Sequence, residues 1–183
     1  MCIRDRKNND NIGLGIFTDK LEQFIPAKKG RKHSLKLLRE LIVHEPESKK
    51  TDINNSLSQI HNILKQHCVI FVISDYISSS FLKPLKFLRN RHDIILVNLS
   101  DIREVEIPNI GYVMLEDMET GEQTMVNTSD ESFQRDFQKN VQNESDKVSK
   151  EIRNLKVEMI GVSEKEPFEL TLRKFFNRRM RYR

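Results

Sequence analysis

Two short, uninterrupted apolar runs dominate the hydrophobic pattern of the chain. The first, Val69–Ile73, is rich in β-branched residues, and the second lies within residues 93–99. Runs of this length without polar alternation are typical of strands buried on both faces, which occur mainly in parallel sheets covered by helices. A predicted helix over about residues 80–90 separates the two runs. The pattern therefore indicates a right-handed parallel βαβ unit.

The segments before the first run indicate a hairpin and two helices. Residues 12–17 and 21–25 predict short strands that pair antiparallel across a tight turn. Apolar positions at helical spacing predict helices over about residues 34–44 and 53–66. Thr51 or Asp52 is expected to cap the second helix, because a short side-chain oxygen there can accept from the first helical amides.

The segments after the second run predict a β-hairpin, a long polar helix, a short strand and a final helix. Their expected ranges are 112–115 and 123–126 for the hairpin strands, 131–154 for the long helix, 157–162 for the strand and 168–180 for the final helix. In the final helix, Leu170, Leu172, Phe175 and Phe176 are expected to face inward, with the arginines outward.

Composition adds an expectation of one soluble domain. The chain has 183 residues, of which 32% are charged and 37% hydrophobic, and it contains no apolar run of about 20 residues. Residues 1–11 show no signal-peptide pattern and are predicted to be a disordered or non-native N-terminus. Two cysteines cannot form a disulfide framework, so a reducing, cytoplasmic location is expected.

The positive net charge is concentrated at the C-terminus. Residues 172–183 contain six basic residues and no acidic one, whereas the remainder is near neutral. A helix end with cations is usually solvated and favours the helix dipole, but binding of the tail to phosphates is an open alternative. The cations are Arg173, Lys174, Arg178, Arg179, Arg181 and Arg183.

Polar residues follow the predicted strands, and they carry the candidate chemistry. Ser74 and Asp75 follow the first apolar run, and the carboxyl ends of strands are where open α/β sheets bind ligands; capping of the next helix is the simpler alternative. Asp19, Asp75 and Asp101 at strand ends would allow a Mg²⁺-dependent phosphohydrolase. The sequence shows no D-x-D motif, no phosphate-binding glycine loop and no nucleophile elbow.

Several stretches together resemble domain-of-unknown-function family fifty-eight, over about residues 10–180. They are NDNIGLGIFTDKLEQFIPAKKGRKHSLKLLREL, KKTDINNSL, VIFVISDYIS, NRHDIILVNLSDIREVEIP, IGYVMLEDMETGEQTMVNTSD and RKFFNRR. The resemblance implies an α/β, Rossmann-like three-layer sandwich of the von Willebrand factor A type, with a mostly parallel sheet. It also implies a metal-ion-dependent adhesion site for Mg²⁺, and a MoxR-type AAA+ ATPase as a partner.

The resemblance assigns two metal-site positions, Thr51 from a second loop and Asp75 from a third. The D-x-S-x-S motif that supplies the other ligands in the family is absent from this sequence. Residues 12–183 are therefore expected to be an incomplete, N-terminally truncated domain that keeps the C-terminal hairpin and long helix. The expected function is non-catalytic protein interaction in assembly or maturation, without tight metal binding by the two residues alone.

Overall fold

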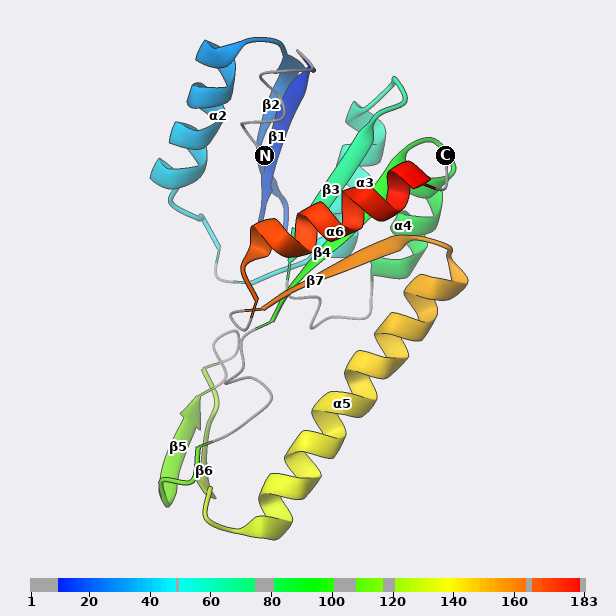
Figure 1. Ribbon diagram of the computed structural model, residues 1–183. Coiled ribbons are helices and arrows are strands. Elements are labelled where there is room, and N and C mark those ends of the chain that lie inside the picture. The colour runs from blue at the N-terminus through cyan, green and yellow to red at the C-terminus, as the bar shows by residue number, and fades with distance from the viewer. Residues whose placement is uncertain are drawn as a thin grey trace. The chain divides into compact units, whose positions relative to one another are not determined.

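The chain divides into two compact units, Met1–Lys65 and Gln66–Arg183. The computed structural model describes residues 10–48, 50–74, 81–100, 108–116, 121–163 and 166–181 (Figure 1). Both units mix helices and strands, and the second contains a three-stranded parallel sheet. The predicted α/β class is confirmed at this level.

The first unit begins with an antiparallel pair, β1 (Ile12–Phe17) and β2 (Leu21–Lys28). The pairing confirms the predicted hairpin, although β2 extends three residues further than expected. A Cβ atom at Gly13 would lie 2.9 Å from the carbonyl oxygen of Ile25, so only glycine allows the two backbones to approach this closely.

Two helices complete the first unit, α2 (Arg31–Val43) and α3 (Ile53–Ile63). Helix α2 begins three residues earlier than predicted, directly after Gly30, whose φ of +101° suits glycine. Asp52 caps α3 by accepting from the Asn55 amide at 3.0 Å, which decides between the two predicted capping residues. Helix α3 ends at Ile63 because the backbone of Leu64 is extended.

The sheet of the second unit has the strand order β3-β4-β7, and all of its pairs are parallel. The predicted βαβ unit is confirmed, because helix α4 connects β3 to β4. The bounds are Val69–Ser74 for β3, Leu82–Arg89 for α4, Asp93–Ser100 for β4 and Glu158–Ser163 for β7.

The prediction that Val69–Ile73 is buried on both faces is wrong. Strand β3 lies at the edge of the sheet, and the exposed fractions of Val69 and Ile73 are 50% and 52%. The central strand β4 has the expected environment, since residues 94–97 are all buried. The continuous apolar run thus predicted a strand of the parallel sheet correctly. It did not predict the position of that strand in the sheet, which depends on the other strands that pair with it.

The two faces of β4 pack against different side chains. Ile95 and Val97 form a cluster with Ile160 and Phe175, and Phe175 belongs to helix α6 (Phe168–Arg181). Because side chains alternate along a strand, Ile94 and Leu96 face the opposite side. Helix α4 contacts β4 and contributes Leu85 and Leu88 to the buried core. In α6, Leu172, Phe175 and Phe176 pack inward as predicted, but Leu170 is exposed.

A hairpin and a long helix lie between β4 and β7 in the chain. Strands β5 (Tyr112–Glu116) and β6 (Gln123–Asn127) pair antiparallel, and α5 spans Glu131–Asn154, as predicted. Thr128 is completely buried at the base of the hairpin. Its Oγ1 accepts from the Ile110 amide at 3.0 Å and donates to the Gly111 carbonyl at 2.8 Å. These bonds join the segment before β5 to the segment that leads into α5.

Candidate metal site and its surroundings

Oxygen-bearing side chains gather where the parallel strands of the second unit end. Ser74 pairs in register with Asn98, and the neighbouring strand β7 ends at Ser163. The register brings Ser74 and Asn98 from neighbouring strands to the same level of the sheet. The carboxyl edge is therefore polar although the strands leading to it are apolar, as expected for an open α/β sheet that binds ligands there.

Asn98 has an acceptor without a donor. Its side-chain oxygen Oδ1 is buried, and no described residue donates a hydrogen bond to it. A buried, unsatisfied carbonyl oxygen costs about 1–3 kcal/mol, and a bound cation or a further donor would remove that cost. Nothing in the sequence pattern singled out Asn98, because its significance depends on the burial of one atom.

Thr51 lies on the first unit, beside the turn of the β1–β2 hairpin. It is exposed, and the next residue, Asp52, donates its amide to the Thr18 carbonyl at 3.0 Å. Asn55 Nδ2, in the first turn of α3, donates to the Asp19 carbonyl at 2.8 Å, so the segment from Asp52 to Asn55 is attached to the turn at two points. The first unit therefore holds the predicted ligand Thr51 on a defined loop.

The second predicted ligand, Asp75, lies outside the described residues, as does Asp101. The pairing of Thr51 with Asp75, and the set of Asp19, Asp75 and Asp101 proposed for hydrolysis, both stay predictions. The carboxylate of Asp19 lies 3.2 Å from Thr18 Oγ1. Within the described ranges, no three His, Cys, Asp or Glu side chains are grouped so that they could hold a metal ion.

The donor set can be compared with what Mg²⁺ requires. Mg²⁺ prefers hard oxygen ligands, normally with one or two carboxylates. Ser74 and Asn98 of the second unit supply oxygens of the right kind but no negative charge. The described residues therefore fit Mg²⁺ in ligand type and not in ligand number, and tight binding needs carboxylates from elsewhere.

Glu22 is the centre of a hydrogen-bonded cluster in the first unit. Its carboxylate accepts from Thr18 Oγ1 at 2.5 Å and from the Glu47 amide at 3.0 Å, and it lies 2.6 Å from His44 Nε2. The hydrogen bond from Thr18, with those from His44 and the Glu47 amide, lowers the pKa of Glu22 below its ordinary value of 4.5. These contacts join β2 to the segment that follows α2.

We expect Glu22 to make the first unit sensitive to acid. Because the pKa is lowered in the folded state, its stabilising contribution is complete above pH 4.5 and disappears as the pH falls through the folded-state value. Thermal unfolding measured between about pH 6 and pH 3 should show a smaller loss of melting temperature for Glu22→Gln than for the unmodified chain. The control is Glu45→Gln, on an exposed side chain nearby, and equal slopes for all three proteins would contradict the assignment.

The opposite edge of the parallel sheet is crossed by ion pairs. Arg179 of α6 pairs with Asp93 at the start of β4, and its Nε lies 3.1 Å from Glu158 at the start of β7. The three side chains are largely shielded and border a pocket of about 440 Å³, which is also lined by His67, Arg89, His92 and Lys156. Arg179 thus attaches α6 to two strands, a role that its place in the basic tail did not indicate.

Other tail cations also have partners within the chain. Lys174 pairs with Glu166, and the Arg178 guanidinium lies 5.8 Å from the centre of the Phe175 ring. Arg183 lies outside the described residues. Fewer cations of the last helix are therefore free to face solvent alone than the count of basic residues suggested.

These features define a mixed α/β protein with a parallel sheet whose carboxyl edge is lined with oxygen donors. The chain belongs to the family described as protein of unknown function DUF58, which matches residues 2–147. Membership of this family, which the sequence resemblance indicated, is thereby confirmed. No solved structure matches the chain.

The curated relatives are themselves uncharacterized proteins. The chain is 27% identical over 100 residues to proteins of Mycobacterium bovis and Mycobacterium tuberculosis, covering 53% of this chain and 32% of each relative. It is 30% identical over 118 residues to a protein of Mycobacterium avium, covering 63% of this chain and 69% of that relative. The chain therefore spans about a third of the length of the first two relatives.

Proposed function

We propose that this chain is part of a von Willebrand factor A-like protein-interaction domain without catalytic activity. In the intact domain, the carboxyl edge of the sheet would hold Mg²⁺ with the help of Thr51 and Asp75, and the ion would bind an acidic side chain of a partner. The domain would act with a MoxR-type AAA+ ATPase in the assembly or maturation of other proteins. Membership of the family supports this proposal, and the buried acceptor of Asn98 carries it.

The edge position of β3 supports a further part of the proposal, that the intact domain has an additional parallel strand. All-parallel sheets normally have covered faces and short or covered edges. Val69 and Ile73 of β3 are half exposed, so this strand presents apolar side chains to solvent. A strand that carries the D-x-S-x-S motif and pairs with β3 would cover this edge and bring the remaining metal ligands to Ser74 and Asn98.

The proposal is tested by binding to the AAA+ ATPase encoded in the same genome. We expect the gene product that includes the residues encoded upstream of residue 10 to bind the ATPase in Mg²⁺. Chelation or Asp75→Ala should weaken binding by about tenfold or more, because the bridging cation is lost. The present chain alone should bind Mg²⁺ more weakly than about 1 mM, since Asp75 is the one carboxylate that the resemblance assigns to the site.

Asp136→Ala is the matched control, because Asp136 is an exposed carboxylate within α5 and not a residue of a strand end. If neither chelation nor Asp75→Ala weakens binding to the ATPase, the proposed metal-bridged interaction is overturned. Hydrolysis of a phosphate ester that Asp75→Ala abolishes and Asp136→Ala does not would instead support the phosphohydrolase. An upstream reading frame without D-x-S-x-S would overturn the proposed additional strand.

A further inference from the structure

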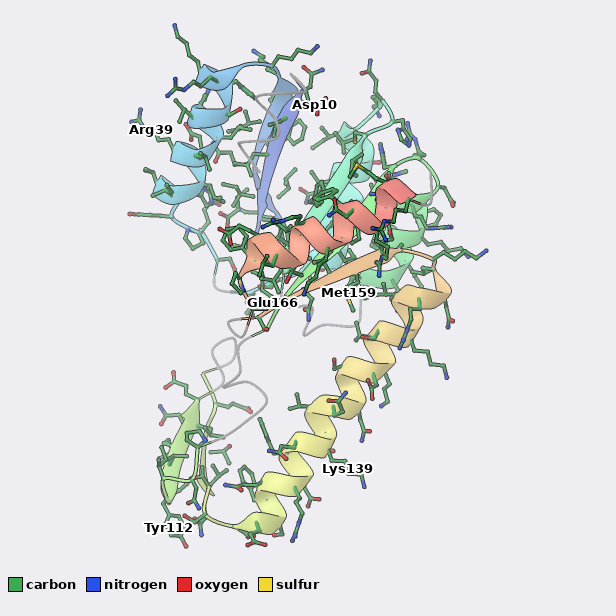
Figure 2. All side chains as sticks on the ribbon, in the orientation of Figure 1. Asp10, Arg39, Tyr112, Lys139, Met159 and Glu166 are labelled. Carbon is green, nitrogen blue, oxygen red and sulfur yellow. The ribbon has the colours of Figure 1, made fainter. Side chains whose placement is uncertain are left out.

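One face of the β5–β6 hairpin presents three large apolar side chains to solvent, those of Tyr112, Met114 and Met125. Tyr112, Met114 and Glu116 alternate on one face of β5, and their register partners Asn127, Met125 and Gln123 share that face. Tyr112 is 75% exposed and Met125 is 67% exposed, and Met114 is similarly open. Figure 2 shows Tyr112 extending from the start of β5. These six residues are called the hairpin face below.

The sequence around the hairpin face is strongly acidic. Between Arg103 and Arg135 the sequence has eight acidic residues and no lysine or arginine, and those that the structure describes are Glu116, Glu122, Asp130 and Glu131. Exposed methionines and an aromatic ring adapt to a range of apolar surfaces. A partner for the hairpin face should therefore combine an apolar stripe with positive charges on its flanks.

Helix α2 has this combination on its outer side. Leu37 packs inward, whereas Leu35, Leu38 and Ile42 form an exposed stripe, with Ile42 at 81%. Four exposed cations accompany the stripe, and within the described part of the chain none of them has an ion-pair partner. They are Arg31, Lys32, Lys36 and Arg39. Arg39 extends away from β1 and β2 in Figure 2.

The only acidic residue of α2 does not interrupt this surface. Glu40 is half buried and accepts a hydrogen bond from Gln23 Nε2 of β2 at 3.1 Å. The outer face of α2, meaning the stripe and its four cations, is therefore purely basic and apolar. Helix α6 is a weaker match, because Lys174, Arg178 and Arg179 already contact groups within the chain.

We propose that two copies of this chain associate head to tail, with the outer face of α2 of one copy lying on the hairpin face of the next. The 13 residues of α2 extend about 20 Å, and the five-residue strands of the hairpin about 17 Å, so the two faces match in length. A helix laid along a short ribbon buries less than a standard interface, so the association is weak and depends on ionic strength. The inference does not depend on the proposed function.

Sedimentation velocity of the full chain over a concentration series tests the proposal. At about 0.05 M salt the average mass should rise with concentration, and at about 0.5 M salt the rise should be much smaller. Ile42→Glu and Met125→Glu should each lower the association constant by about tenfold or more, because each places a carboxylate in the contact. Circular dichroism should show unchanged folding, since both side chains are exposed.

Leu170→Glu, on an exposed position of the other basic helix, is the matched control and should leave association unchanged. A synthetic peptide with the sequence of residues 31–43 should compete with association, and the same peptide with glutamate at position 42 should not. A chain that stays monomeric at all concentrations in low salt would overturn the proposal. The proposal would also be overturned if Leu170→Glu lost association while Ile42→Glu kept it, because the contact would then belong to α6.

Discussion

Replacement of Phe175 by alanine is expected to destabilise the second unit by about 3–5 kcal/mol. The Phe175 ring is buried against Ile95, Val97 and Ile160, and it meets the Phe176 ring edge to face with centroids 5.4 Å apart. Removing it leaves a cavity between α6 and the sheet and loses the aromatic contact. Since domains of this size have a total stability of about 5–15 kcal/mol, a large part of the unit's stability would be lost.

Amide hydrogen exchange in β4 measures this effect, because the central strand should open only on unfolding of the unit. Phe168→Ala is the control on the same helix, where the ring is exposed, and it should cost less than about 1 kcal/mol. Equal exchange rates in the two variants would show that α6 does not stabilise the sheet through Phe175.

Replacement of Leu85 by alanine should destabilise the same unit by about 2–5 kcal/mol, through the other side of the sheet. Leu85 is completely buried in α4, the helix that connects β3 to β4 and contacts β4. Its loss leaves a cavity. The cavity can collapse only in part, because α4 is a short helix held between two paired strands. Urea unfolding followed by circular dichroism gives the change in free energy of unfolding.

Phe87→Ala, on the exposed side of α4, is the matched control for Leu85→Ala and should change stability much less. The double replacement of Leu85 and Phe175 carries further information. If α4 and α6 cover opposite faces of the sheet and share no partner, the two losses should add to within about 0.5 kcal/mol. A large deviation from additivity would mean that both side chains belong to one packed cluster.

The elements were predictable where local pattern decides them. The hairpin strands, the βαβ unit and the full length of α5 appear as the hydrophobic periodicity indicated. Periodicity did not indicate which side of α2 turns inward. The stripe Leu35, Leu38 and Ile42 has the spacing of a core face, yet it is exposed because α2 is attached to the hairpin through Leu37, His33 and Glu40. Helical spacing fixes a face, and only a neighbouring element decides what that face contacts.

The candidate site likewise has features that the sequence predicted and features that depend on packing. Sequence placed Ser74 at the carboxyl end of a strand, and the family resemblance assigned Thr51 and Asp75, a pairing that stays a prediction. The buried acceptor of Asn98 had no signal in the sequence, since asparagine in a strand is common and only packing isolates its oxygen. The ion pairs of Arg179 with Asp93 and Glu158 had none either, because they join residues far apart in the chain.

By itself, the sequence determined the α/β class, the order of helices and strands, and membership of the family, because these follow from short-range periodicity and from the order of local motifs. Tertiary structure alone decided that β3 is an edge strand among the described strands, and that α2 and the hairpin present apolar side chains to solvent. It also decided that Arg179 of the last helix pairs with Asp93 and Glu158, at the starts of two strands. These properties depend on which elements pack against each other. The free energy of that packing comes from burial and pairing between residues that are far apart in the chain, so no local sequence pattern predicts it.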